Sequence, residues 1–183
     1  MDHEKIMQGV RYILEGLGED PQREGLRETP KRFAEMAEEI LAGIHQTPSL
    51  KAGFSEEVAD DLIIIRDIPF YSMCEHHLLP FFGKIHLAYI PKQNKVAGFS
   101  SLTRLVDVFS RRLQIQERLT QQIANAMMKF LDPKGVLVII EAHQLCVSMR
   151  GDKKASVRTV TKTIRGEISA DCLSLLKLSQ TDV

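Results

Sequence analysis

The order of strand-like and helical segments after residue 60 is the feature that most constrains the fold of this chain. Residues 61–70, 82–90, 136–149 and 156–164 are rich in β-branched or alternating apolar side chains, which predicts four strands. Residues 102–112 and 116–131 space their apolar side chains as helices do. Two strands, two helices and two further strands predict an α+β fold, in which an antiparallel sheet of hairpin-paired strands carries two helices.

The first 60 residues have a different character. Apolar residues recur at helical spacing over residues 3–17, and Thr29 and Pro30 are typical of an N-cap and a first helical position. Residues 43–53 begin and end with glycine and predict a loop. We therefore expect an N-terminal helical appendage over residues 1–60 and a core over residues 61–183, with a short helix at residues 170–178.

Composition excludes several classes of function. The 24 basic and 24 acidic residues balance, so no global positive field exists to attract nucleic acid or an anionic membrane. The charged N-terminus has no signal-peptide core behind it, and no apolar run approaches the length of a membrane span. Three cysteines are too few for a disulfide framework. We expect a globular cytoplasmic protein whose cysteines can serve as ligands.

A cluster of metal-binding residue types lies between the first two predicted strands. Cys74 and His77 are separated by two residues in a predicted turn, and a thiolate with an imidazole suits zinc. Cys146 is the plausible third ligand, because Cys172 lies among leucines of the predicted terminal helix. Three protein ligands leave a position for water, which is typical of catalytic zinc. The alternative is two buried thiols and an ordinary turn histidine.

Alternation along residues 136–149 extends this prediction. Side chains of a strand alternate between faces, so Gln144, Cys146 and Arg150 are expected on one face and His143 on the other. An arginine beside the metal could bind a phosphate or a carboxylate, although a solvated arginine at a strand end is also common.

Two helix starts carry candidate substrate-binding residues. Glu117, next to Gln116, could bind an N–H-rich ring such as guanine, or it could simply complement the helix dipole. Ser100 and Arg104 open the shorter helix, where they could contact phosphate, and Ser100 could instead cap the helix.

Taken together, these residues resemble the GTP cyclohydrolase I family over nearly the whole chain. The matching stretches, in chain order, are Gly18-Glu19-Asp20-Pro21, Arg23-Glu24-Gly25-Leu26, Thr29-Pro30-Lys31-Arg32, Asp67-Ile68-Pro69-Phe70, Cys74-Glu75-His76-His77-Leu78-Leu79-Pro80, Tyr89-Ile90-Pro91, Gln116-Glu117-Arg118-Leu119-Thr120 and Cys146-Val147-Ser148-Met149-Arg150-Gly151.

The resemblance implies a tunnelling fold, a toroidal homodecamer with active sites between subunits, and zinc bound by Cys74, His77 and Cys146. It implies conversion of GTP and water to dihydroneopterin triphosphate and formate, the first step of folate and pterin biosynthesis. In that reaction the imidazole ring of guanine opens and the ribose rearranges. The roles it implies are guanine binding by Glu117 and Gln116, acid–base work by His76, and triphosphate binding by Ser100, Arg104, Arg150 and Arg32, the last from a neighbouring subunit.

Two positions depart from the family pattern. Gln144 stands where the family normally has histidine, and Ser101 stands where it usually has lysine. Glutamine cannot transfer a proton near neutral pH. One alternative is therefore an enzyme that only opens the imidazole ring and keeps the formyl group in a formamidopyrimidine nucleotide. A second alternative is a non-catalytic, zinc-stabilised paralogue with a regulatory or assembly role.

Overall fold

The computed structural model describes residues 1–54, 61–150 and 156–168 and divides the chain into two compact units, Met1–Ala42 and Gly43–Val183. The predicted boundary after residue 60 lies outside the described residues, as does the helix predicted at residues 170–178. Both therefore stay predictions. No described helix has the length and apolar character needed to cross a membrane.

The N-terminal unit is a pair of helices. α1 (His3–Gly16) is capped by the Asp2 carboxylate, which accepts a hydrogen bond from the backbone N–H of Lys5 at 3.1 Å. α2 (Thr29–Ile40) has Glu28 at its N-cap, one residue earlier than predicted. Small buried residues of α2, Ala34 and Ala37, let the two helices pack closely. A short 3-10 helix (Ala42–His45) follows.

The C-terminal unit is built on a five-stranded sheet with the order β5-β2-β3-β6-β7. Antiparallel pairing joins β2 (Ile63–Cys74), β3 (Pro80–Ile90), β6 (Gly135–Gln144) and β7 (Thr159–Gly166). The short β5 (Leu113–Gln114) pairs in parallel with the end of β2. A separate two-stranded ribbon pairs β1 (Ala52–Phe54) with β4 (Lys95–Ala97).

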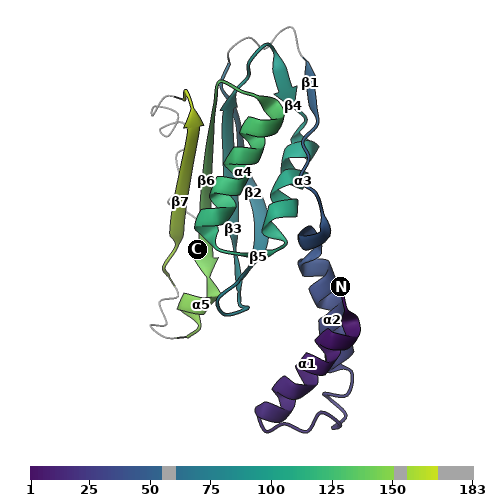
Figure 1. Cartoon of the computed structure of the whole chain (residues 1–183). Helices are drawn as coiled ribbons and strands as arrows, with labels where there is room; N and C mark the ends of the chain where they lie inside the picture. The colour runs from purple at the N-terminus through teal and green to yellow at the C-terminus, as the bar shows by residue number, and fades with distance from the viewer. Residues whose placement is uncertain (55–60, 151–155, 169–183) are drawn as a thin grey trace. The chain divides into compact units, whose positions relative to one another are not determined.

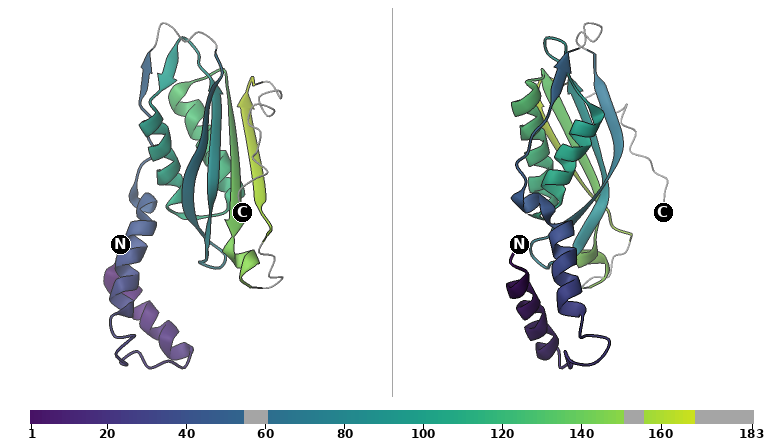
Figure 2. Two further views of the ribbon diagram at one scale, coloured as in Figure 1. Left: turned by 180° about the vertical axis from the view of Figure 1, so that it is seen from behind. Right: turned by 90° about the vertical axis from the view of Figure 1, so that its right-hand side faces the viewer.

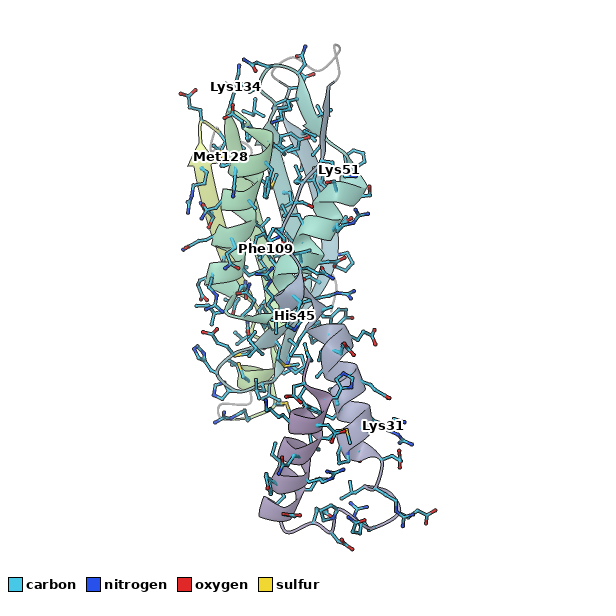
Figure 3. All side chains as sticks on the ribbon, turned by 45° about the vertical axis from the view of Figure 1, so that its right-hand side comes forward. Lys31, His45, Lys51, Phe109, Met128 and Lys134 are labelled. Atoms are coloured by element: carbon cyan, nitrogen blue, oxygen red, sulfur yellow. The ribbon has the colours of Figure 1, made fainter. Side chains whose placement is uncertain are left out.

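Two helices, α3 (Phe99–Ser110) and α4 (Gln116–Leu131), cover one face of this sheet (Figures 1 and 2). Phe109 of α3 belongs to the core between helices and sheet, and the half-buried Met128 of α4 packs against it; both are labelled in Figure 3. Ile85, Leu87 and Tyr89 of β3 are fully buried there, as their alternation predicts. The chain therefore has the α+β tunnelling-fold order of strands and helices, and the fold-class prediction is confirmed.

β3 and β6 approach each other unusually closely at Gly83. A Cβ atom on this residue would lie 1.9 Å from the carbonyl oxygen of Glu141 and 2.8 Å from the Cα atom of Ala142. Only glycine fits a backbone approach of this kind. The contact lies two residues from the pair formed by Phe81 and Gln144 at the end of β6.

The strand predicted over residues 136–149 is too long. β6 ends at Gln144, and residues Leu145–Ser148 form a short helix, α5. Side-chain alternation therefore stops at Gln144, and the argument that placed Cys146 and Arg150 on one strand face with Gln144 is wrong. β-branched and apolar residues at 145–149 suit either structure, so local periodicity could not locate this change.

Candidate active site

A tight turn between β2 and β3 brings two candidate ligands together. The N–H of Cys74 donates to the carbonyl of Leu79 at 2.9 Å, and the N–H of Leu78 donates back to the carbonyl of Cys74 at 2.9 Å. Leu78 adopts a positive φ of 52°, which closes the turn. As a result the Sγ atom of Cys74 lies 4.0 Å from the Nδ1 atom of His77.

The third candidate ligand arrives from the neighbouring strand. The end of β6 pairs with the start of β3, and α5 then turns Cys146 toward the turn, so that one ligand atom each from Cys74, His77 and Cys146 lies within 4.8 Å of the others. It is the only such group in the described part of the chain. Burial and the neighbouring Cys74 thiol raise the pKa of Cys146 above its usual value. A cation between the two sulfur atoms would reverse that effect.

The donor set fits a zinc ion. Zinc–sulfur bonds of about 2.3 Å and zinc–nitrogen bonds of about 2.0 Å place tetrahedral ligand atoms roughly 3.5–3.8 Å apart. The 4.0 Å separation of Cys74 Sγ and His77 Nδ1 is close to that spacing. Two thiolates and one imidazole favour zinc over harder cations, and a three-ligand set is typical of catalytic zinc.

Glu75 links this turn to the start of α4. The guanidinium of Arg118 contacts both oxygens of the Glu75 carboxylate, with Nη1 3.3 Å from Oε1 and Nη2 against Oε2. Arg118 holds the pKa of Glu75 below its usual value through this hydrogen bond. Sequence reasoning assigned no role to either residue, although both lie within the family motifs.

The side chain of Gln116 is buried, and both its nitrogen and its oxygen form hydrogen bonds. Its Nε2 atom donates to the carbonyl oxygens of Ile140 and Thr159, both at 2.9 Å, and lies 3.2 Å from the Thr161 hydroxyl. Only 2% of the residue is exposed. The amide therefore joins α4 to β6 and β7.

Gln144 takes its orientation from Gln116. Carbonyl groups only accept hydrogen bonds, so the nitrogen of Gln116 must face them and its oxygen must face Gln144. The Nε2 atom of Gln144 donates to this oxygen at 2.8 Å. His143 lies on the opposite face, with its ring 5.9 Å from that of Phe82. Continuous pairing of residues 135–144 with β3 leaves no bulge that could redirect His143.

Glu117 and His76 are both exposed beside these anchored residues. The Glu117 carboxylate forms no ion pair or hydrogen bond with the described residues. His76 Nε2 lies 3.9 Å from an oxygen of Glu75. The structure thus gathers Cys74, His76, His77, Cys146, Glu117, Gln116 and Gln144 at one end of the sheet.

The predicted phosphate-binding residues are dispersed. Gln114, which pairs with Cys74, donates to the carbonyl of Phe109. The C-terminal end of α3 therefore lies next to the turn that carries the candidate ligands Cys74 and His77, which we call the metal turn. Ser100 lies at the other end of this 12-residue helix, which spans roughly 18 Å. Arg104 is one turn further along and exposed.

The remaining predicted residues lie elsewhere. Arg150 is exposed just after α5. Arg32 is exposed on α2 of the N-terminal unit. Ser101, which replaces the usual lysine, accepts a hydrogen bond from the backbone N–H of Lys51 at 2.8 Å.

The sequence profile and the curated relatives agree on one family. The sequence profile described as "GTP cyclohydrolase I" matches residues 6–178. The chain is 56% identical to GTP cyclohydrolase 1 of Carboxydothermus hydrogenoformans, over 91% of this chain and 87% of that protein. It is 54% identical to the Streptococcus mutans protein of that name (93% and 89%) and 50% identical to that of Halalkalibacterium halodurans (97% and 98%). A solved archaeosine synthase QueF-like structure matches with a TM-score of 0.47 and 16% identity, over 59% of this chain and 96% of that one.

Proposed function

Because the chain belongs to the GTP cyclohydrolase I family and is a hydrolase of that type, we propose that it converts GTP and water to dihydroneopterin triphosphate and formate. The observation that carries the proposal is the group of Cys74, His77 and Cys146 together with the Glu117 carboxylate, which has no partner among the described residues. We place this reaction at the first step of folate and pterin synthesis in the cytoplasm, where cysteines stay reduced.

The proposed metal is zinc, held by Cys74, His77 and Cys146. Bound zinc lowers the pKa of a coordinated water toward neutrality and supplies a nucleophile. His76 is the proposed acid–base group, because it is exposed in the turn that carries Cys74 and His77 and histidine is the commonest acid–base side chain in catalysis.

Glu117 is the proposed guanine anchor. A carboxylate can accept both the ring N–H and the amino N–H of guanine, and that of Glu117 is exposed and unpaired among the described residues. The guanine contact predicted for Gln116 stays part of the proposal, and its buried amide also bonds to Ile140, Thr159 and Gln144.

Ser100, Arg104, Arg150 and Arg32 remain the proposed triphosphate ligands. The separation of Ser100 from the turn that carries Cys74 and His77 is compatible with a site completed by another subunit. The homodecamer is proposed from the family resemblance. Arg32 would come from a neighbouring copy, as the family resemblance implies.

The test is incubation of the zinc-loaded protein with GTP, followed by measurement of product mass and formate. Equal amounts of dihydroneopterin triphosphate and formate are expected. Absence of turnover of any purine nucleotide, with nucleotide binding intact, would contradict the proposal and favour the non-catalytic paralogue. Cys146→Ser should lose both bound zinc and turnover.

A second candidate function is arrested ring opening, and the fixed amide of Gln144 favours it. This side chain donates to Gln116 and cannot exchange a proton with the opened ring. If the reaction stops there, the product retains the formyl group, and Gln144→His should raise formate release by on the order of 10²-fold. Stoichiometric formate from the unmodified protein would exclude this candidate.

A further inference from the structure

Two segments 43 residues apart in sequence are joined by one ion pair at the site. Glu75 lies between the candidate ligands Cys74 and His77, and Arg118 directly follows the proposed guanine anchor Glu117. Both oxygens of Glu75 contact the guanidinium, in the fork geometry that fixes orientation as well as distance.

Arg118 is itself held at two further points. Its Nε atom donates to Oε1 of Gln114 at 3.0 Å, and Nη2 donates to the carbonyl of Leu113 at 3.0 Å. The backbone N–H of Glu75 donates to the carbonyl of Gln114 at 3.1 Å. The metal turn, β5 and the first turn of α4 are therefore joined by a closed ring of hydrogen bonds. Within this ring Glu75 and Arg118 cannot move independently.

The other flank of Glu117 is also fixed, through the buried amide of Gln116. Glu117 thus stands between two anchored residues while its own carboxylate has no partner among the described residues. An acidic group held in this way can accept hydrogen bonds from a ligand. Its position relative to the metal turn depends on Arg118, because Arg118 is the neighbour of Glu117 that binds Glu75 in that turn.

We propose that Glu75 and Arg118 are positioning residues that set the place of Glu117 relative to Cys74 and His77, and so couple zinc binding to recognition of the purine base. The inference rests on the proposed function. Neither residue touches the substrate. The ion pair acts through its neighbours, by holding the metal turn against the first turn of α4.

Folding stability alone does not account for the pair. The side chains of Arg118 and Glu75 keep 38% and 32% of their surface exposed, and partly exposed ion pairs contribute little to stability. Groups that orient metal ligands, in contrast, typically change metal affinity or activity 10- to 100-fold when they are removed.

The test uses Glu75→Gln, Arg118→Gln and the double variant in the full-length protein. Zinc affinity is measured by competition with a chromophoric chelator. Base recognition is measured as the Kd of 7-deaza-GTP, in which carbon replaces N7 so that hydrolysis cannot open the ring. Each single variant should weaken both affinities about 10-fold. The double variant should bind zinc and 7-deaza-GTP about as tightly as the single variant with the lower affinity, because the two residues act as one unit.

Asp132→Asn is the matched control. It removes a carboxylate from the exposed pair with Lys92, and asparagine tolerates the positive φ of 48° at this position. It should change neither affinity. An unchanged 7-deaza-GTP affinity in Glu75→Gln, or additive losses in the double variant, would overturn the inference.

Thermal unfolding separates positioning from folding. Retained Tm with weakened affinities supports positioning, whereas losses that only follow a lowered Tm contradict it. If the unmodified protein does not turn over GTP, the proposed function fails, but both affinities still test the ion pair. If turnover is normal and Glu75→Gln has no effect, only the inference fails.

Discussion

At the scale of single residues, Gln116 and Gln144 form a two-amide chain that connects α4 to two strands. Each link has a defined donor and acceptor, and Gln116 is almost fully buried. A residue at 144 is therefore constrained from two sides: it must donate to Gln116, and it lies beside the candidate metal ligand Cys146.

Gln144→Leu should lower the free energy of unfolding by about 1–3 kcal/mol, because it leaves the buried oxygen of Gln116 without a donor. Urea unfolding followed by circular dichroism measures this. Gln121 is an exposed residue on α4, the helix of Gln116. The free energy of unfolding of Gln121→Leu should stay within about 0.5 kcal/mol of that of the unmodified protein. Equal effects of the two substitutions would contradict the two-amide chain.

His86 is a buried titratable residue on the other face of the sheet. Its Nδ1 atom accepts from the backbone N–H of Asp67 at 3.2 Å, and its Nε2 atom lies 3.6 Å from an oxygen of Glu141 without a hydrogen bond. Burial lowers the pKa of His86 below its usual value and Arg66 and Lys84 add to this, whereas Asp67 and Glu141 oppose it.

Stability should therefore fall as the solution is acidified. The pKa of His86 is lower in the folded chain than in the unfolded chain, so the unfolded chain binds the proton first as pH drops below about 6.5. The free energy of unfolding should decrease between about pH 7 and pH 5, and less steeply in His86→Asn, which keeps an acceptor for Asp67. Equal slopes in urea titrations would contradict this assignment.

At the scale of elements, the long segments followed from sequence and the short ones did not. The strong periodicity of residues 116–131 predicts a helix with the observed ends. β5 has two residues and α5 has four, too few for a period to be visible. Tertiary contacts determine both: β5 exists through its pairing with β2, and α5 follows the end of β6.

The same contrast applies to the site. The spacing of Cys74 and His77 predicts a turn with two candidate ligands, and Cys146 lies near them although the strand argument for it is wrong. The contacts of Gln116 and the pairing of Glu75 with Arg118 join residues 24 to 45 positions apart. Nothing in local sequence indicates such partners, because they meet only after the sheet has formed.

Gly83→Ala tests the closeness of β3 and β6. The added Cβ would lie 1.9 Å from the Glu141 carbonyl oxygen, so the strands must separate, at a cost of about 3 kcal/mol. Gly53→Ala is the control, since a Cβ there meets nothing within 4 Å. Differential scanning calorimetry should show a large drop in Tm for the first variant alone; similar Tm values would refute the constraint.

At the scale of the whole molecule, one chain does not bring all the proposed site residues together. The C-terminal end of α3 lies beside the metal turn, whereas Ser100 and Arg104 lie nearer to the N-terminal end of this helix. If they bind the phosphates of a nucleotide held at Glu117, we propose that a second copy supplies them.

Subunit mixing tests this requirement. Arg104→Ala and Cys74→Ser should each abolish most turnover alone. Co-expressed chains should recover about a quarter of the unmodified activity, because random assembly pairs an intact metal turn with an intact α3 at about one site in four. No recovery, with mixed oligomers demonstrated by mass spectrometry, would place both residues in the same chain's site.

The closeness of the Cys74 and Cys146 sulfur atoms also makes this site vulnerable to oxidation. They lie within 4.8 Å of each other, so an oxidant such as hydrogen peroxide can join them as a disulfide once no metal separates them. Metal-stripped protein should then form a Cys74–Cys146 crosslink, detected by peptide mass mapping, while zinc-loaded protein resists. A zinc ion bound at this site would thus also protect its own ligands. Loss of zinc under oxidative stress would let the disulfide form, and the site would stay inactive until a reductant restores the thiols.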